Sequence, residues 1–573
     1  MITIRSIFAW VPPVLVRPVP RIWGPGLATL LAAVLFALPA AAQQTRADAE
    51  KDPILKAMLE ELDRSKAGLQ LPGFEKPFFI EYRIQDVTSY DTRAEFGASE
   101  GSQSQHQRAV RVTVRVGDYK TDSSTPRGDG AVEMTAVEDD PIALRSTLWT
   151  ATDNAYKAAL AAYAQKQAEL KQVQTPPQAD DFSHEKPLIS LAPPAVLGLS
   201  EQAKADWDER VARDSGLYRT AAAAQAKEAN LQLSSASFNG RAVTTRLVNS
   251  EGTIVRKSST GYEESLRVDT QAADGMRLSR SHVSSGVALT ELDSADEFTK
   301  SSVRLIESLA NLRNAPLVEE EYHGPVLFSS HASAEIMHTL LVNGLAATRP
   351  RLGTEARTNG SFASSYHARI LPDFLDAVDD PGLKTLDGKL LAGAYEVDDE
   401  GVPARAVQLV TGGKLENYLI GREPVRDFPQ SNGHAQAGLM GPARPAIGVL
   451  KISAGNGLPD DELDKKLLEM ARDRGLSSVY YAATIGAGLA PHVLYRVSVA
   501  DGKRELVRGA ALGDLDQRAL RSGIEAAGSK LWTANSIGEF PNTVLAPALL
   551  FDDVTVKRAN EKNNKLPYYP PPD

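Results

Sequence analysis

The sequence predicts an α+β protein, with an N-terminal domain of mixed helices and strands and a C-terminal domain rich in antiparallel β-sheet. Valines alternate with polar residues from position 110 to position 116, the pattern of a strand with one buried face. Residues 153–174 carry apolar side chains at helical spacing in a stretch rich in Ala, Gln and Lys. Beyond residue 316, short β-type runs alternate with Gly and Pro turns. Together these observations favour an α+β fold.

The first part of the chain begins with a predicted amphipathic helix at residues 52–69, which Gly68 is expected to end, and a strand at residues 79–84. Two further helices, at residues 153–174 and 200–231, are separated by a proline-rich connection. Strands resume directly after the second of them. We therefore interpret the two helices as an αα-hairpin inserted into the N-terminal domain.

The strands resume with a predicted hairpin, in which residues 243–248 and 253–257 flank a turn from Asn249 to Gly252. A helix at residues 301–314 closes this part of the chain. The sequence thus divides into a signal peptide, the first part of the N-terminal domain, the helical hairpin, the second part of the N-terminal domain and the C-terminal domain, at residues 1–42, 43–152, 153–231, 232–316 and 317–573.

The C-terminal domain is predicted from short strands and one clear helix. Residues 404–410 and 414–420 are joined across two glycines at positions 412 and 413, an antiparallel pattern. The helix at residues 459–474 starts with acidic residues at its positive end and stops before Gly475.

The N-terminus has the features of a Sec-type signal peptide. Basic residues precede an apolar run at residues 27–38, and small residues follow it up to Ala42, after which we expect cleavage. A permanent anchor is the alternative, but the apolar run is shorter than the ~20 residues of a membrane-spanning helix. We expect a periplasmic or otherwise exported protein without stable membrane insertion after signal cleavage.

The composition limits which kinds of partner the chain is expected to bind and which cysteine-dependent chemistry it can carry out. The chain has 573 residues, a hydrophobic fraction of 42% and a net charge of −10, which is spread along the sequence. This distribution argues against a nucleic-acid partner and favours peptides, proteins or small molecules. The chain contains no cysteine, so disulfides, thiolate nucleophiles and Cys-bearing zinc sites are excluded.

One helix carries the strongest candidate for chemistry. His331, Glu335 and His338 follow an apolar segment at spacings of four and three, which place them on one helical face. Two imidazoles and a carboxylate are adequate zinc ligands, and Glu335 could instead be the general base that activates a water. The alternative is a polar stripe, in which His331 caps the helix, Glu335 faces solvent and His338 packs in a polar pocket.

Three ligands from one short helix rarely converge on one metal, because the helix rises roughly 10 Å over this stretch. A zinc site would therefore take two of them and a distant residue, with His434 or His367 as candidates and His323 as a weaker one. The acidic runs at residues 379–380 and 398–400 lack EF-hand spacing and are expected to be solvated loops.

Several segments occur in an order that resembles the TldD/TldE (PmbA) metallopeptidase family. They are GPVLF with the helix after it, DDEGVPAR, GGKLENYL and SNGHA, with a strand pair upstream and a closing segment downstream, at residues 324–341, 398–405, 412–419, 431–435, 247–259 and 503–528.

The resemblance implies a pair of related subunits that cleave unfolded or modified peptides in a closed chamber. TldD-type chains carry a His-Glu-x-x-x-His helix that binds zinc, whereas TldE-type chains keep the fold and lack that motif. In this sequence Ala334 and Thr339 stand at the two histidine positions, and only Glu335 is kept. The resemblance therefore implies the TldE-type branch, in an exported form, with no bound cofactor and a peptide substrate.

Two other hypotheses remain open from the sequence. The chain could be an active zinc peptidase whose ligands have moved to His331, Glu335 or His338 together with His434. It could also be a non-enzymatic peptide-binding protein or scaffold. The resemblance further implies a homodimer, or a heterodimer with a TldD-type homologue.

Overall fold

The computed structural model describes residues 44–124, 130–175, 177–219 and 229–559. Contacts divide the chain into residues 1–44 and one compact unit from Thr45 onward, to which the following description applies. The predicted signal peptide, residues 1–42, lies outside the described residues. None of the described helices has the length and hydropathy needed to cross a membrane.

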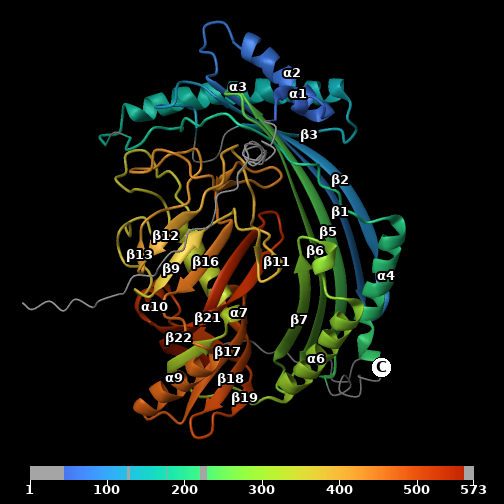
Figure 1. Cartoon of the computed structure of the whole chain (residues 1–573), viewed down its shortest axis with the longest axis vertical. Coiled ribbons are helices and arrows are strands. Elements are labelled where there is room, and N and C mark those ends of the chain that lie inside the picture. Colours follow the sequence, from blue (N-terminus) through green and yellow to red (C-terminus); the bar gives the residue numbers. More distant parts are fainter. Residues whose placement is uncertain (1–43, 125–129, 176, 220–228, 560–573) are drawn as a thin grey trace, which may run out of the picture. The chain divides into compact units, whose positions relative to one another are not determined.

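The N-terminal part is built on a sheet of long, curved strands, seen on edge in Figure 1. Its order is β3-β2-β1-β5-β6-β4, and β7 also pairs with β6. The bounds of these strands are β1 (Phe79–Glu95), β2 (Ala98–Arg115), β3 (Ala131–Met134), β4 (Ile189–Leu191), β5 (Leu233–Asn249), β6 (Ile254–Gln271) and β7 (Arg277–Gly286). The predicted strand at residues 79–84 and the predicted hairpin across Asn249 to Gly252 are both present, but their strands are longer than the apolar pattern indicated.

The two faces of this sheet differ in chemistry. Even-numbered residues of β1, such as Tyr82 and Ile84, are buried on what we call the outer face, under two groups of helices. Odd-numbered residues such as Arg83 and Gln85 lie on the inner face and donate hydrogen bonds to carbonyl groups of residues 437–441. The inner face is therefore polar and meets the C-terminal half of the chain.

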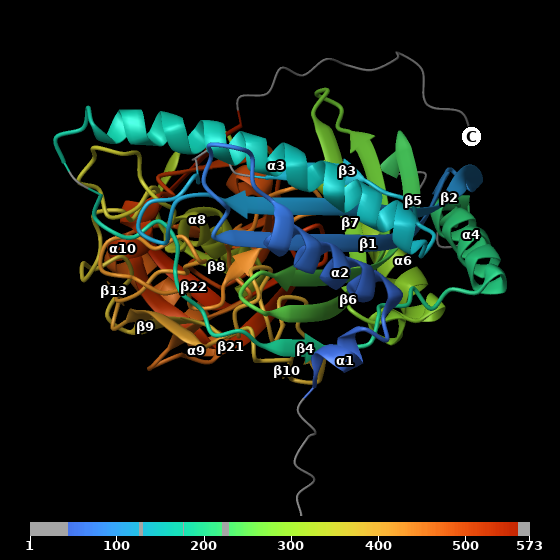
Figure 2. The ribbon, with the colours of Figure 1, turned by 90° about the horizontal axis from the view of Figure 1, so that it is seen from above.

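Helices α2 (Pro53–Gly68) and α3 (Pro141–Leu170) cover one half of the outer face, and α4 (Glu201–Ser215) and α6 (Ala295–Asn314) cover the other. Figure 2 shows α3 running across the strands beside α2. Asp52 begins α2 by accepting hydrogen bonds from the backbone of its first turn, as an N-cap should. The helix ends at Gly68, as predicted.

The expected αα-hairpin is not formed as such. Helix α3 packs on α2 and β2, whereas α4 packs on β1 and β5 at the other end of the sheet. The chain between them contributes β4, which pairs in parallel with β6 and so carries the backbone across the sheet. Local periodicity identified the two helices, but the intervening strand decides where each one packs.

The C-terminal part contains a second, mostly antiparallel sheet in the order β13-β12-β9-β16-β22-β8-β17-β18-β19, with β20 and β21 also paired to β22. Two pairs of strands in this sheet, β16 with β22 and β17 with β8, are parallel. The strands are β8 (Tyr322–Phe328), β9 (Leu375–Asp379), β12 (Val407–Thr411), β13 (Lys414–Leu415), β16 (Val449–Ala454), β17 (Ser478–Gly486), β18 (Ala490–Ser498), β19 (Arg504–Val507), β20 (Ala510–Gly513), β21 (Ile524–Ser536) and β22 (Asn542–Arg558).

Short elements complete this part. They are the hairpins β10 (Thr385–Leu386) with β11 (Lys389–Leu390) and β14 (Ala435–Gln436) with β15 (Arg444–Pro445), and the helices α7 (Ser330–Met337), α8 (Asn343–Leu345), α9 (Asp460–Asp473) and α10 (Gln517–Ser522). A four-residue helix, α1 (Arg46–Ala49), precedes α2. The α+β class and the sheet-rich C-terminal half predicted from the sequence are therefore confirmed.

Two large cavities lie between the inner face of the first sheet and the C-terminal part. The first, about 590 Å³, is bordered by β5 and β6 and is called here the β5–β6 cavity. The second, about 770 Å³, is bordered by β1, β2 and α3 and is called the β1–β2 cavity. A smaller one of about 170 Å³ is lined by His338 and is called the α7 cavity. It shares Gln436 with the first and Pro445 with the second.

Candidate functional site

Helix α7 carries the residues that the sequence singled out, and its start is fixed by Ser329. The Ser329 hydroxyl accepts a hydrogen bond from the N–H of Ala332 (3.1 Å) and donates one to the carbonyl oxygen of Ala483 (2.7 Å). Ser329, and not His331, is therefore the N-cap. The apolar side of α7 packs on β17, β21 and β22, which leaves His331 and Glu335 on its more open side.

Glu335 lies close to two imidazoles, of which the sequence indicated only one. Burial has the largest effect and lowers the pKa of His331 and of His492 in β18 below the ordinary value. The negative charge of Glu335 acts in the opposite direction on both imidazoles and offsets part of this lowering. The ring of His331 rests beside the indole of Trp532, with centroids 5.2 Å apart. Glu335 Oε1 accepts a hydrogen bond from the hydroxyl of Thr339 (3.2 Å). A carboxylate, two imidazoles and an indole thus gather on one side of α7.

A buried arginine from the first sheet adjoins this group. Arg280 of β7 donates a hydrogen bond from Nη1 to the carbonyl oxygen of His492, and its positive charge lowers the pKa of the His492 imidazole. Burial lowers the pKa of Arg280 itself to about 10, and its Nη2 atom has no hydrogen-bond partner among the described residues. The site therefore draws on both halves of the chain.

His492 and Arg280 are the residues that sequence reasoning missed. Arg280 falls in a segment predicted only as a strand, and His492 follows a proline in a run without metal-ligand spacing. Neither carries a local signal, because their proximity to Glu335 comes from strands that are far apart in the sequence.

His338 is separated from this group by a change in the helix. Residues His338–Val342 form a π-helical turn between α7 and α8, so the regular spacing assumed from the sequence ends at His338. The side chain lines the α7 cavity together with Phe540 and Asn542. His338 is exposed and this lining mixes apolar with polar residues, so the polar pocket that the sequence offered as one alternative is not formed as such.

His434 is part of a different, fully buried arrangement. Its Nε2 atom lies 3.1 Å from Asp379 Oδ1, and its Nδ1 atom lies 3.1 Å from the carbonyl oxygen of Asn432. Both ring nitrogens therefore face oxygen atoms of the protein, and neither is directed toward a metal position. His434 links the loop at residues 431–435 to the end of β9.

The other candidate histidines lie elsewhere. His367 Nδ1 is 2.8 Å from Glu416 Oε2 on an exposed edge, and His323 Nδ1 is 3.0 Å from the hydroxyl of Thr555. Neither appears among the groups whose charge acts on His331 or His492.

The acidic runs are not solvated loops as expected, because Asp379, Asp398 and Asp399 are buried and Asp380 and Glu400 are half-buried. Asp398 accepts hydrogen bonds from the N–H groups of Glu400, Val402 and Ala435, at 2.8–3.1 Å. Burial raises the pKa of Asp398 to about 6. Its carboxylate closes the tight turn at residues 398–402 through short-range bonds to the backbone.

The donor set does not match a zinc site as the residues are placed. Within residues 44–124, 130–175, 177–219 and 229–559, no three or more His, Asp or Glu side chains are grouped so that they could hold a metal ion. His331, His338 and His434, the predicted ligands, lie in three different surroundings. Zinc requires ligand atoms at about 2 Å in tetrahedral arrangement, and these three side chains do not provide it.

The fold and the site around α7 define a class of α+β proteins. In this class a long sheet with a polar inner face packs against a second, mixed sheet, and a helix follows strand β8 of that second sheet. Residues 320–558 match the PmbA/TldA metallopeptidase C-terminal domain. The C-terminal part of the chain therefore carries the domain of the family that the sequence motifs indicated.

Solved structures support the same fold. TldE from Thermococcus kodakarensis is 14% identical over 87% of this chain and 100% of its own, with a TM-score of 0.57. A candidate modulator of DNA gyrase from Thermotoga maritima MSB8 is 14% identical over 87% of this chain and 99% of its own, with a TM-score of 0.56. Another from Bacteroides thetaiotaomicron VPI-5482 is 12% identical over 90% and 99%, with a TM-score of 0.52. No curated protein matches the chain.

Proposed function

We propose that the chain is an exported TldE-like subunit, silent as a peptidase by itself, that works in proteolysis beside a metal-bearing TldD-type relative. The observation that carries the proposal is the chemistry of two helix positions. Ala334 and Thr339 stand where the family's zinc motif has histidines. Ala334 is 2% exposed, so its methyl group is a packing element, and the Thr339 hydroxyl is bonded to Glu335.

This arrangement leaves Glu335 without the ligand pair that would hold a catalytic ion beside it. A methyl group cannot coordinate a metal, and a threonine hydroxyl is not among the usual zinc ligands. Glu335 instead accepts a hydrogen bond from a neighbour on its own helix. In this proposal the chain helps to shape the peptide-binding chamber of a homo- or heterodimer, while the partner supplies the hydrolysis.

The test uses the mature chain, with zinc content and peptide hydrolysis as separate readouts. We expect no stoichiometric zinc and no cleavage of an unstructured peptide unless a TldD-type chain is added. Cleavage by the lone chain that disappears in Glu335→Ala, but persists in Glu469→Ala, would overturn the proposal. Glu469 is a matched control because it is an exposed helical glutamate on α9.

A second candidate, an active zinc peptidase with rearranged ligands, is favoured by one observation: His331 and His492 both lie near Glu335. It requires these side chains to move together on metal binding. One zinc per chain that is lost in His492→Ala and kept in His338→Ala would support it. A non-enzymatic scaffold is the third candidate, and recovery of a peptidase homologue with the tagged chain would argue against it.

Export is tested independently of activity. We expect mass spectrometry of the exported form to give an N-terminus after Ala42. Recovery of the chain with its N-terminus intact would contradict this part of the proposal.

A further inference from the structure

The β1–β2 cavity is the larger of the two cavities along the inner face and is rich in positive charge. Its wall is formed by β1, β2 and α3 on one side and by the loops at residues 347–352, 421–423 and 442–445 on the other. Arginine and lysine side chains outnumber glutamates in this wall. The volume of about 770 Å³ is within the range of small-molecule and peptide-binding sites.

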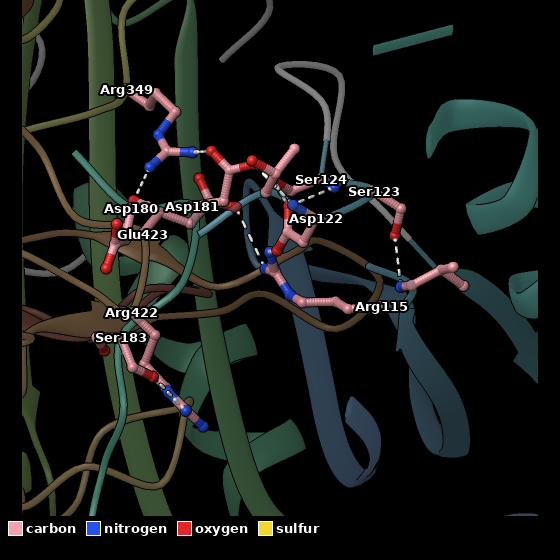
Figure 3. A network of polar contacts seen from close by, with 12 residues as sticks. Arg115, Asp122, Ser123, Ser124, Asp180, Asp181, Ser183, Arg349, Arg422 and Glu423 are labelled. Atoms are coloured by element: carbon pink, nitrogen blue, oxygen red, sulfur yellow. Dashed lines mark hydrogen bonds and ion pairs between the residues drawn. The ribbon is translucent and has the colours of Figure 1, made fainter. Parts of the chain in front are cut away.

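Four of the eight arginine and lysine side chains in the described wall form an ion pair with a carboxylate: Arg115, Lys166, Arg349 and Arg422. Figure 3 shows one part of the wall, where Arg115 Nη1 lies 2.6 Å from Asp122 Oδ2 and Arg349 is paired with Asp181. These ion pairs hold the side chains of the wall in place, and in each pair the positive charge of the arginine is balanced by a carboxylate. They do not by themselves require a ligand.

Arg83 is different. Its side chain projects from β1 into the cavity, and the residue is only 3% exposed. Its Nη2 atom donates a hydrogen bond to the carbonyl oxygen of Gly441. Among the described residues its buried Nε atom has no acceptor, and no ion pair to Arg83 is formed. A buried guanidinium without a counter-ion is costly, and a buried donor without an acceptor is rare in folded proteins.

A second arginine stands directly opposite. Arg111 on β2 is the register partner of Arg83 on β1, and its Nη1 atom donates to the carbonyl oxygen of Met440 at 3.1 Å. Like charges on directly paired residues destabilise a sheet. The loop at residues 440–441 thus contacts both guanidiniums through its carbonyl groups.

No glutamate of the described wall forms an ion pair with Arg83. Glu423 lies 3.3 Å from Arg115, and Glu169 accepts a hydrogen bond from Gln165 on its own helix at 2.8 Å. Burial, followed by the negative charge of Asp398, raises the pKa of Glu400 well above its usual range, and Glu400 Oε2 accepts a hydrogen bond from the backbone N–H of Arg422. Glu81, the fourth, lies two residues before Arg83 on the same face of β1, and no ion pair joins these two described residues.

We infer that the β1–β2 cavity is a binding site for an oxyanion, a carboxylate or a phosphate of a bound ligand, held by Arg83 together with the opposed Arg111. The guanidinium fork matches two oxygens of either group and would satisfy the free Nε–H of Arg83. The site goes beyond the proposed function, because it requires neither a metal nor hydrolysis.

The test compares three probes on the full mature chain by isothermal titration calorimetry. They are an acetylated tri-alanine peptide with a free C-terminal carboxylate, its C-terminal amide, and inorganic phosphate. We expect saturable binding of at least one anion and none of the amide at the same site. Binding of the free peptide alone assigns a carboxylate, and binding of phosphate alone assigns a phosphate. Failure of both anions to bind overturns the inference.

Two variants locate the site. Arg83→Gln should weaken binding of the anion at least ten-fold, whereas Arg518→Gln, which removes the same charge from an 86% exposed side chain on α10, should leave it unchanged. Without anion, Arg83→Gln should melt at the same or a higher temperature than the parent, because it removes an uncompensated buried charge. Equal binding by Arg83→Gln and the parent would contradict the inference. If Arg83→Gln does not fold, Arg83→Lys keeps the charge, loses the fork, and should bind more weakly by the same measurement.

Discussion

Arg422 and Glu251 form a two-pronged ion pair that joins the two halves of the chain. Nη1 of Arg422 lies 2.7 Å from Oε2 of Glu251, and Nη2 lies 2.9 Å from Oε1. The Arg422 side chain is 1% exposed, and its guanidinium carbon lies 4.0 Å from the ring centroid of Phe182. Glu251 belongs to the turn between β5 and β6, so this pair fixes the C-terminal loop at residues 421–423 to the first sheet.

The first prediction concerns this pair. Arg422→Met should lower the free energy of unfolding by about 3–5 kcal/mol, because it leaves the Glu251 carboxylate without its partner in a largely buried site. The double variant, Arg422→Met with Glu251→Gln, should lose less unfolding free energy than the sum of the two single variants, because it leaves no buried charge without a partner. Urea unfolding measures all three.

The control is an exposed pair of the same kind. Lys465 and Asp461 on α9 are 74% and 71% exposed, and Lys465→Met should leave the unfolding free energy nearly unchanged. Strict additivity of the Arg422 and Glu251 substitutions would show that the two side chains act independently.

The second prediction concerns the imidazoles near α7. Burial holds the pKa of His331 and of His492 below 6.5, and the charge of Glu335 raises both. Glu335→Gln should therefore lower both pKa values further, because a carboxylate that favours the imidazolium form is removed. Titration of the ring protons by NMR measures the change.

Arg280→Gln serves as the complementary variant. The Arg280 charge lowers the pKa of His492 and is not among the causes that act on His331. The variant should raise the pKa of His492 and leave that of His331 in place. A shift of both histidines by the same amount would contradict the arrangement described for this site.

The third prediction is a pH dependence of stability that comes from Asp398. Burial raises the pKa of this carboxyl from 3.8 to about 6. The folded state therefore binds more protons than the unfolded state between these values, and its stability falls as the pH rises through this window. The full effect is on the order of 3 kcal/mol, from about 1.4 kcal/mol per pKa unit.

The measurement compares the chain with Asp398→Asn, whose side chain is neutral throughout. The difference in unfolding free energy between the two should shift in favour of the variant as the pH is raised from about 4 to about 6.5, the window between the two pKa values. A difference that stays constant over this range would show that the Asp398 carboxyl is not the group responsible.

The fourth prediction tests the backbone of the loop that carries His434. Gly433 has a φ of +77°, and an added Cβ would overlap the carbonyl oxygen of Pro403. Gly433→Ala should destabilise the chain by more than about 2 kcal/mol, because it combines an unfavourable φ with a clash against backbone. Gly475 has a φ of +66° with nothing within 4 Å, so Gly475→Ala should cost only about 1 kcal/mol from the dihedral angle. Thermal unfolding of the two variants separates the effect of the clash from that of the dihedral strain. Equal losses of stability in both would show that the clash at Pro403 does not contribute.

Much of the fold could be read from local patterns. The helix that ends at Gly68, the hairpin across Asn249 to Gly252 and the helix at residues 459–474 all lie where periodicity and turn residues predicted them. Each is encoded within a few neighbouring residues, through side-chain alternation, helix caps and glycine turns. The expected αα-hairpin failed for the opposite reason, since the partner of each helix is set by the sheet and not by the next helix.

The sequence by itself determined the α+β class and the family of the C-terminal domain, because residue identity and short-range spacing are sufficient for both of these. The tertiary structure alone decided that Glu335 meets His492, that His434 is bonded to Asp379, and that Arg83 faces a cavity without a counter-ion among the described residues. An alternating pattern shows that a strand has two faces, but strand pairing across long stretches of chain decides which charges meet on them.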